Sequence, residues 1–402
     1  MSSIQSALQL RTFGKSYPLQ ARARYPEWRL PARFLGVAEI NIRADFQMVS
    51  MKDVAKAAGV SQPAVSYAYS GSSKVSASQR EHILSVAASL GYPGPNLRGR
   101  SLRSGRVGAI GLVVMDQLSY AFDDPWAMSL LKGIARVNEL ANVALTLFPL
   151  KNKKLEGDQE GDANLAVRGL VDGLIVSTLP DDHPITQFIV KRKIPAVIID
   201  SPRLEGVHFV GIDDRQAATD QMEHILALGH TKIGILVERL IPDGKRGRVS
   251  QKRFKHSTEM IARERLTAYI ETAERHGIDY DDLMIVEAGG FTEALGREAA
   301  SILLSESGVS AIVASSDVMA LACLSQAEKE GVEVPGQLSV IGFDDVPDAA
   351  PRGLTTIRQS IIGKGEFAAR ILLDELEASE PLQPVIKIFD TSLVVRSTTR
   401  QV

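Results

Sequence analysis

Residues 52–66 constrain the fold more than any other part of this chain, because they contain two short helical patterns separated by one glycine. The apolar face of the first pattern consists of Val54, Ala55 and Ala58. Gly59 follows where a left-handed residue would end that helix, and Ser61 is placed to cap the second helix, with Pro63 in its first turn. Two helices joined in this way outline a helix-turn-helix, whose second helix enters the DNA major groove.

A third helix completes a compact unit over residues 51–92. Ser76 to Gln79 form a capping-box pattern at its start, and Gly91 and Pro93 end it. Its predicted apolar face consists of Ile83, Leu84, Ala87 and Leu90. We therefore expect an all-α headpiece, residues 48–92.

Charge is distributed unevenly along the chain. Between Met51 and Arg106 lie eight basic and two acidic residues, a formal charge of +6, whereas the whole chain of 402 residues carries −2. A basic segment on a neutral-to-acidic body indicates one surface that faces nucleic acid.

Composition excludes several other classes of protein. Cys323 is the only cysteine, which rules out an intrachain disulfide and a cysteine-rich zinc site and fits a reducing cytoplasm. No apolar run approaches the roughly 18–20 residues of a membrane span, and no secretory core lies near the N-terminus. We expect a cytoplasmic protein with no membrane partner.

Residues 1–47 carry seven basic and three acidic residues and show no helical or strand period. An organelle transit peptide and a basic arm that binds DNA are two interpretations. The one we favour is a non-native or disordered extension, with translation starting at Met48 or Met51.

Several short motifs occur in order over about fifty residues. They are Asp53-Val54-Ala55, Ala58-Gly59-Val60-Ser61, Val65-Ser66, Val75-Ser76 and Leu90-Gly91-Tyr92. This segment resembles the headpiece of the lactose-repressor (LacI/GalR) family of bacterial transcription regulators. The following residues, Pro95-Asn96 and Arg100-Ser101-Leu102, resemble the hinge helix of that family.

The resemblance implies that residues 93–106 fold into a helix only when two copies meet on DNA. Leu102 would then enter the minor groove and wedge between base steps, which kinks the duplex. Gly99 stands where alanine is more usual and should raise the cost of folding this helix. The alternative is an ordinary flexible linker.

From Val107 onward strands alternate with helices, which indicates doubly wound parallel sheets. The expected strands are 107–114, 143–148, 171–176, 196–199, 232–237, 284–287, 311–314, 338–343 and 393–396. Because these are too many for one modest sheet, we expect two α/β lobes. They resemble the periplasmic-binding-protein-like core of the same family, with lobe one over about 107–229 plus 356–384 and lobe two over about 230–355 plus 385–402.

The resemblance also places the residues that would contact DNA. Gln62, Pro63 and Tyr67 are the candidate base readers, and Ser61 and Ser66 would contact phosphate or cap helices. The candidate hinge contacts are Asn96, Arg100 and Leu102. Many relatives carry Thr-Val-Ser-Arg where this chain has Ala64-Val65-Ser66-Tyr67. Tyrosine cannot make the bidentate contact of arginine to guanine, so the operator cannot be copied from relatives.

A small-molecule site is expected at the carboxyl ends of the strands, where open α/β sheets bind ligands. Asp116, Asp200 and Asp344 follow strands, and Asp317 lies at another strand-to-helix turn. By resemblance to the family, Arg265 would hydrogen-bond the effector, and the aromatic platforms would be Trp126 and Phe291. Carboxylates and arginine suit vicinal hydroxyls, and aromatic faces suit a sugar ring. The alternative is that each aspartate only caps the next helix.

The segment 243–255 is strongly basic and is interpreted as a solvated loop. A second nucleic-acid patch and attraction of an anionic effector are its alternatives. His224 and His230 are interpreted as helix-end residues.

Enzyme motifs are missing from the sequence: it has no phosphate-binding P-loop, no His-Glu-x-x-His, no Gly-x-Ser-x-Gly and no cysteine pair. We therefore expect no catalysis, no cofactor and no metal.

The predicted function is that of a homodimeric, sequence-specific repressor. It binds a pseudo-palindromic double-stranded operator, and a small effector, a sugar or related metabolite, controls its affinity for that operator. A sugar-binding protein of a transport system and a regulator gated by a protein partner are the alternatives.

Overall fold

The computed structural model describes residues 49–94, 106–115, 118–137, 143–150, 170–306 and 308–402. The chain divides into two units, Met1–Gly94 and Pro95–Val402. The extension 1–47 and the hinge residues Asn96, Arg100 and Leu102 lie outside the described residues, and so does Asp116.

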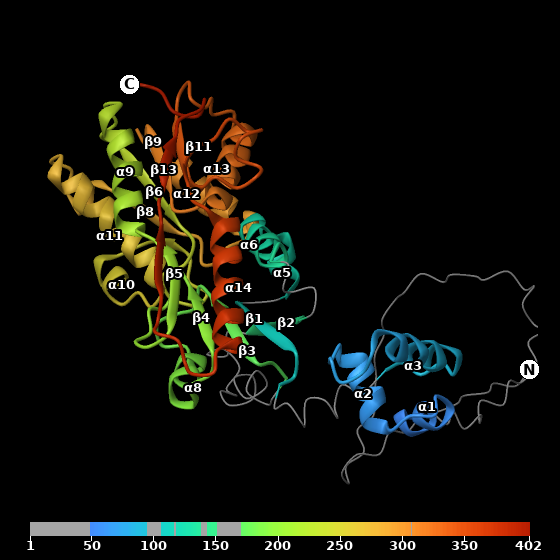
Figure 1. The fold of residues 1–402 in the computed structure, drawn as a ribbon. Coiled ribbons are helices and arrows are strands. Elements are labelled where there is room, and N and C mark those ends of the chain that lie inside the picture. Colours follow the sequence, from blue (N-terminus) through green and yellow to red (C-terminus); the bar gives the residue numbers. More distant parts are fainter. Residues whose placement is uncertain (1–48, 95–105, 116–117, 138–142, 151–169, 307) are drawn as a thin grey trace, which may run out of the picture. The chain divides into compact units, whose positions relative to one another are not determined.

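The described part of the first unit is the predicted three-helix headpiece, formed by α1 (Met51–Ala57), α2 (Gln62–Ser70) and α3 (Ala77–Ser89) (Figure 1). Gly59 has a φ of +66°, and the Ser61 hydroxyl accepts a hydrogen bond from Ala64 N at 3.4 Å, as the pattern predicts. Nine buried apolar residues hold the helices together, Val54, Val65 and Ile83 among them.

One detail of the headpiece prediction is wrong. On α3, Ile83 and Ala87 are buried, but Leu84 and the C-cap residue Leu90 remain 37% and 38% exposed. The headpiece is too small for α3 to bury a wide stripe, since among the described helices only α1 and α2 pack against it.

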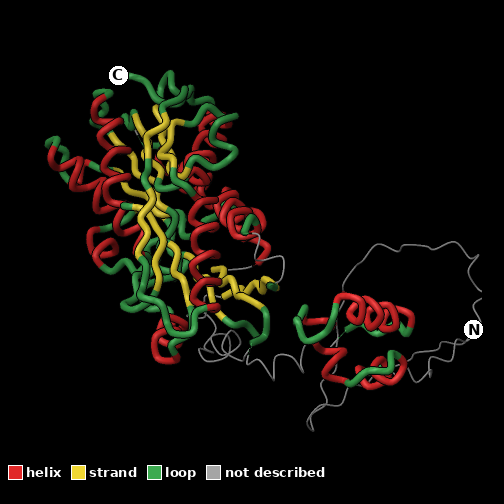
Figure 2. The backbone as a smooth tube through the Cα atoms, viewed as in Figure 1, coloured by secondary structure: helices red, strands yellow, loops and turns green. Residues whose placement is uncertain are grey.

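The first lobe of the second unit is built on a six-stranded parallel sheet with the order β12-β5-β4-β3-β1-β2. Figure 2 shows the strands of the second unit in yellow, with helices in red beside them. The strands of the six-stranded sheet are β1 (Ala109–Met115), β2 (Ala144–Leu150), β3 (Gly173–Ser177), β4 (Ala196–Ile199), β5 (His208–Ile212) and β12 (Ile386–Phe389). One face packs against α6 (Pro125–Ala135), which α5 (Leu118–Asp123) contacts, and α14 (Ile361–Glu377), while the other packs against α8 (Pro184–Arg192).

The second lobe has a seven-stranded sheet with the order β13-β11-β10-β9-β6-β8-β7. Its strands are β6 (Ile233–Val237), β7 (Gly247–Arg248), β8 (Met284–Glu287), β9 (Ala311–Ala314), β10 (Ser339–Asp344), β11 (Thr355–Arg358) and β13 (Ser392–Val394). On one face lie α9 (Asp214–Ala227) and α11 (Met260–Arg275), and on the other α12 (Glu293–Leu304) and α13 (Asp317–Glu330). The two shorter helices are α10 (Gln251–Lys255) and the 3-10 helix η3 (Tyr280–Asp282).

The predicted lobe boundaries need correction at three places, because the chain crosses between the lobes three times. Helix α9 packs on the second sheet, so the first lobe does not extend to residue 229. Strand β11 belongs to the second sheet, and β12 belongs to the first. Each crossing is set by strand pairing between distant segments, which the local sequence pattern does not record.

The basic segment 243–255 is not a simple solvated loop. It contains β7 and α10, and the Arg253 guanidinium, 12% exposed, pairs with both Asp243 and Glu287. His230 is buried, and its ring nitrogens contact Ser310 Oγ at 2.9 Å and Ser339 Oγ at 3.0 Å. Its position after α9 agrees with the helix-end interpretation.

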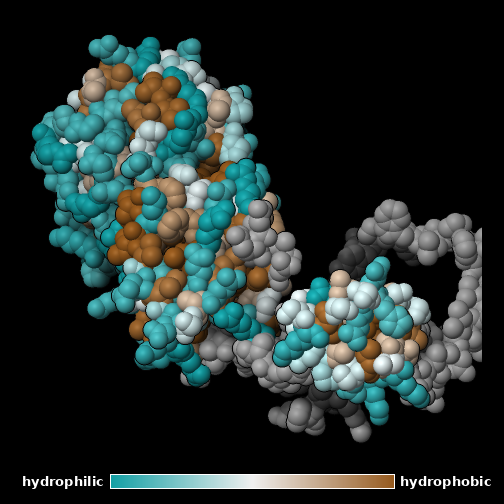
Figure 3. Space-filling model, viewed as in Figure 1, coloured by the Kyte–Doolittle hydropathy of each residue, from teal (hydrophilic) through white to brown (hydrophobic). Residues whose placement is uncertain are grey.

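None of the helices in the described part of the chain is long and apolar enough to cross a membrane. The face of the molecule in Figure 3 is largely hydrophilic, with apolar patches between the hydrophilic residues. Ile386 on the edge strand β12 is 67% exposed, the largest exposure among the big apolar side chains of the described sheet strands.

Helices α6 and α14 approach each other through glycines. A Cβ atom added to Gly133 of α6 would overlap the carbonyl oxygen of Ile362, and one added to Gly365 of α14 would overlap that of Leu130. The close approach matters for function because α6 carries Trp126 and α14 carries Lys364, which lie beside each other in the second unit.

Gly133→Ala should therefore destabilise the second unit by about 1–3 kcal/mol, since backbone atoms must move apart. Urea unfolding of the full chain, followed by tryptophan fluorescence, measures this change. The matched control is Gly363→Ala on α14, where an added Cβ meets the side chain of Ser360, which can move. Equal stability of the two variants would contradict the tight-contact argument.

Candidate functional site

The N-terminal half of α2 presents the residues predicted to contact DNA. Gln62 and Pro63 are exposed in its first turn, and the Ser61 hydroxyl is occupied as the helix cap. Ser66 and Tyr67 are half-buried, and Tyr67 packs against the headpiece core. The helix therefore exposes Gln62 and Pro63 to solvent and Tyr67 only in part.

Lys74 is a basic residue of this surface that the sequence analysis did not single out. Its Nζ lies 5.0 Å from the centroid of the Tyr67 ring, and the side chain is exposed. The Arg80 guanidinium donates to the carbonyl of Ser72 at 3.0 Å and holds the loop between α2 and α3. Lys74 was visible only as one member of the basic segment; its contact with Tyr67 depends on the folded loop.

The second unit contains a cavity of about 170 Å³ between its two lobes. Five of the seven residues predicted to contact an effector line it: Trp126, Asp200, Arg265, Phe291 and Asp344. The carboxyl ends of several strands from both sheets meet here, as expected for open α/β sheets.

Asp317 is a correction. It is fully buried and does not line the cavity, although its neighbour Ser316 does. Its carboxylate accepts hydrogen bonds from Val346 N at 2.9 Å and Thr356 Oγ1 at 2.6 Å, and it occupies space that a Cβ on Gly342 would fill. Burial raises the pKa of Asp317 to about 7. The hydrogen bonds of Asp317 therefore lie in the lobe interior and not at the cavity.

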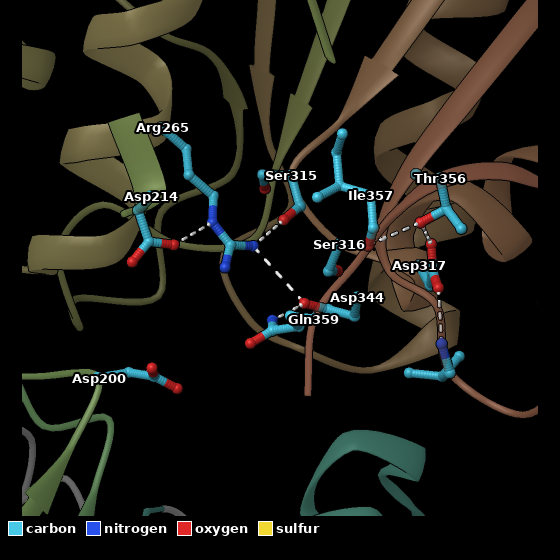
Figure 4. A network of polar contacts seen from close by, with 12 residues as sticks. Asp200, Asp214, Arg265, Ser315, Ser316, Asp317, Asp344, Thr356, Ile357 and Gln359 are labelled. Carbon is cyan, nitrogen blue, oxygen red and sulfur yellow. Dashed lines mark hydrogen bonds and ion pairs between the residues drawn. The ribbon is translucent and has the colours of Figure 1, made fainter. Parts of the chain in front are cut away.

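Arg265 of α11 lines the cavity and contacts several groups of the polar network in Figure 4. Its Nε donates to Asp214 Oδ1 at 2.8 Å and its Nη1 to the carbonyl of Ser315 at 2.5 Å, while Asp344 Oδ1 lies 3.8 Å away. The guanidinium also lies 3.5 Å from the centroid of the Phe343 ring. These contacts hold the side chain in one orientation.

Burial raises the pKa of the Asp344 carboxyl well above its ordinary value, and the Arg265 guanidinium offsets only part of that rise. The pKa of Asp214 is raised for the same reason, again partly offset by Arg265. The single guanidinium of Arg265 therefore offsets part of the effect of burial on the pKa of both carboxyls.

A fully buried lysine that the sequence analysis missed continues this network. Lys364 Nζ donates to both carboxylate oxygens of Asp200, at 2.8 and 2.6 Å, and to Gln359 Oε1 at 2.5 Å. The Gln359 amide in turn donates to Asp344 Oδ1 at 2.5 Å. Since Asp200 ends a strand of the first sheet and Asp344 one of the second, the contacts join the two lobes.

Aromatic rings from both lobes line the cavity, and each has a cation beside it. Lys364 Nζ lies 5.3 Å from the Trp126 ring, and Arg239 Cζ lies 4.6 Å from the Phe291 ring. Arg239 pairs with Glu259 at 2.7 Å, and both line the cavity.

Glu238 is a further lining residue, and here a signal was available in the sequence. It directly follows the strand expected at 232–237, in the position that made Asp200 a candidate. Lys364 gave no comparable signal, because it lies within an amphipathic helix whose charged residues are otherwise mostly exposed.

Three non-glycine residues of the cavity wall have strained backbone conformations. Thr178, Asp200 and Asp344 have positive φ values of 52°, 64° and 120°, and all three line the cavity. Such conformations cost about 1–3 kcal/mol each in non-glycine residues and concentrate at functional sites. In the described part of the chain, no cluster of three or more His, Cys, Asp or Glu side chains could hold a metal ion.

Comparison with known proteins agrees with this architecture. Residues 50–96 match the family described as bacterial regulatory proteins, lacI family, and residues 222–399 match the periplasmic binding protein-like domain. An HTH-type transcriptional regulator of Mycobacterium tuberculosis is 36% identical over 83% of this chain and 92% of its own length. The HTH-type transcriptional repressor CytR of Escherichia coli is 30% identical over 87% of this chain and 96% of its own length.

Solved structures of similar proteins have the same fold. The transcriptional regulator CelR in complex with cellobiose is 25% identical, with a TM-score of 0.61, over 87% of this chain and 99% of that one. The lac repressor dimer bound to operator and the anti-inducer ONPF is 24% identical, with a TM-score of 0.69, over 88% of this chain and 100% of that one. The headpiece, the two-lobed core and these relatives together show that this chain belongs to the lacI family of bacterial transcriptional regulators.

Proposed function

We propose that this chain is a homodimeric repressor whose affinity for operator DNA is controlled by a small effector bound between the two lobes. The observation that carries the proposal is the cavity, which brings five of the residues expected to bind an effector to one place at the lobe junction. The helix-turn-helix headpiece of the same chain would be the part that binds DNA.

On the DNA side, Gln62, Pro63 and Tyr67 are the proposed base readers. Ser61 is engaged as the cap of α2, so its contribution would be an indirect one through the position of that helix. Ser66 remains a proposed phosphate contact, and the proposals for Asn96, Arg100 and Leu102 rest on family resemblance alone. Two headpieces would bind the half-sites of a pseudo-palindrome.

On the effector side, the cavity offers carboxylates, an arginine and two aromatic rings, the groups that bind polyhydroxylated molecules. The CelR relative binds cellobiose, which supports a carbohydrate or related metabolite here. The lac repressor comparison, a dimer on its operator, and the name of CytR support a dimeric repressor.

Two alternatives remain distinct from this proposal. A sugar-binding protein of a transport system would share the two lobes, but the headpiece disfavours it. A regulator gated by a protein partner would share the whole fold, and its cavity would be vestigial.

Direct contacts between the two lobes suggest how effector binding and lobe closure are linked. Asp181, in the loop after β3 of the first lobe, donates its backbone N–H to the carbonyl of Thr258 in the second lobe at 3.0 Å. The Asp181 carboxylate accepts from Arg263 of α11 at 2.7 Å. An effector that adds contacts to both lobes would favour closure and alter DNA affinity by a coupling free energy of about 1–3 kcal/mol.

The first prediction from the proposed function concerns base reading. Gln62→Ala should weaken binding to an operator chosen by in vitro selection by about 1–3 kcal/mol, because one base contact is lost. Binding to an unrelated duplex should be unchanged.

Lys74→Ala should weaken binding to the operator and to the unrelated duplex alike. It should also lower the slope of log affinity against log salt concentration by about one, as expected for a lost phosphate contact. Fluorescence anisotropy over a salt series measures these effects, and a flat salt response of the parent protein would contradict DNA binding.

The second prediction concerns the effector. A thermal-shift screen of sugars, polyols, nucleosides and sugar phosphates on the full chain first identifies a ligand. Asp344→Asn should then weaken binding of that ligand at least about tenfold, because a carboxyl oxygen of the cavity wall is replaced by an amide nitrogen that cannot accept a hydrogen bond. Asp317→Asn is the control: it should lower thermal stability and leave affinity unchanged. A parent response that survives both Asp344→Asn and Arg265→Ala would favour the partner-gated alternative.

The third prediction concerns closure. Asp181→Arg or Arg263→Asp should shift the lobes toward an open arrangement by up to about 1 kcal/mol, the range for a partly exposed ion pair. Energy transfer between dyes placed at Lys191 and Lys245, which are exposed on the two lobes, measures the separation. The double variant should restore the parent distribution. Identical distributions for all four proteins would show that the pair does not hold the lobes.

A further inference from the structure

The charge of the cavity wall is strongly unbalanced. Of the described residues that line it, five carry carboxyl groups and two carry guanidinium groups. The acidic residues are Asp124, Asp200, Glu238, Glu259 and Asp344, and the basic ones are Arg239 and Arg265. The residues behind this wall do not reverse the balance, because Lys364 and Asp214 carry opposite charges.

Most of the charged groups in and behind the cavity wall belong to ion pairs. Lys364 is committed to Asp200, and Arg239 contacts Glu259 at 2.7 Å. Arg265 contacts Asp214 at 2.8 Å and is 3.8 Å from Asp344. Within the described residues, Glu238 takes part in no ion pair; its carboxylate accepts a hydrogen bond from the Ser315 hydroxyl. Asp124 caps α6, and Asp344 shares Arg265 with Asp214, so the negative surplus lies chiefly on Glu238.

Several polar atoms of this wall remain available to a ligand. In the described structure, no protein group hydrogen-bonds to Nη2 of Arg265, to Oδ2 of Asp344 or to Oε1 of Glu238. Figure 4 shows the Arg265 guanidinium between Asp214 and Asp344. A hydroxyl group can donate to either carboxylate and accept from the guanidinium, whereas a phosphate or carboxylate group can only accept.

The basic segment 243–255 does not compensate for this surplus. Its charges lie outside the cavity lining, and Arg246 and Arg248 pair with Glu298 and Glu306 at the surface. Arg253 is engaged by Asp243 and Glu287. An anionic ligand attracted to this segment would still meet a wall with excess negative charge.

We propose that the interlobe cavity binds a polyhydroxylated ligand without an anionic group, uncharged or bearing an amine, and rejects phosphorylated and carboxylated analogues. The proposal rests on the effector function proposed above and narrows its chemical class. Bringing a unit negative charge within about 6 Å of one unpaired carboxylate at an effective dielectric constant of about 20 weakens binding about a hundredfold.

Matched ligand sets test this selection on the full-length protein. The sets are glucose, glucosamine and glucose 6-phosphate; galactose and galacturonate; ribose and ribose 5-phosphate; cellobiose and cellobionate; adenosine and AMP. Thermal shift at fixed ionic strength compares the members, and calorimetric titration gives the affinity of any that stabilise the protein. We expect stabilisation only by members without an anionic group, with the anionic member at least about a hundredfold weaker.

The Glu238→Gln variant tests whether the charge of Glu238 disfavours anionic ligands. The amide oxygen can still accept from Ser315, so the fold is kept while one surplus charge is removed. In any ligand set whose uncharged member binds, the anionic member should gain at least about tenfold in affinity for the Glu238→Gln protein relative to the uncharged member. Glu328→Gln, at an exposed position on α13, is the matched control and should leave the ratio unchanged.

The outcomes separate this inference from the function on which it rests. An anionic member that binds as tightly as its uncharged counterpart overturns the charge selection and leaves the effector function standing. The charge selection is also overturned if Glu238→Gln leaves the ratio of the anionic to the uncharged ligand's affinity at the parent's value. Absence of any shift in all sets contradicts the effector function itself, and the proposed ligand class with it.

Discussion

The cavity between the lobes depends on one buried ion pair, that of Lys364 with Asp200. The ammonium of Lys364 is fully buried, with both carboxylate oxygens of Asp200 within 2.8 Å. Removal of either partner would leave an uncompensated charge in the interior, which costs several kcal/mol. Through Gln359 the pair reaches Asp344, and beyond it Arg265, so the walls contributed by the two lobes are joined by polar contacts at a crossing of the chain.

Such an arrangement suits a sensor better than an optimally stable protein. Buried charges and positive-φ residues at Asp200 and Asp344 both cost free energy, and the surrounding hydrophobic clusters of the two sheets offset that cost. A ligand that satisfies the remaining polar atoms of the wall gains contacts with both lobes at once. That differential contact is what a change of lobe closure requires. The headpiece is a separate unit with its own small core, so its response must be transmitted along the chain or through a second copy.

Much of the fold could be predicted because it is encoded in local patterns. Strand β4 was expected at the residues where it lies, and the caps at Gly59 and Ser61 have the predicted geometry. The site was predictable where a polar residue follows a strand, as at Asp200 and Asp344. The same rule applied to Glu238, which was overlooked, and it failed at Asp317, whose carboxylate satisfies backbone and threonine donors inside the lobe.

The sequence by itself determined the class of each unit: a basic helix-turn-helix followed by alternating strands and helices, with carboxylates placed at strand ends. Periodicity, capping residues and strand-end chemistry act over a few residues, so they can be read from the chain directly. Tertiary structure alone decided which lobe β11 and β12 join, that Lys364 is buried against Asp200, and that Glu238 and Asp344 share a wall with too few cations. Those features arise from contacts between residues up to 177 positions apart, and no local pattern specifies such contacts.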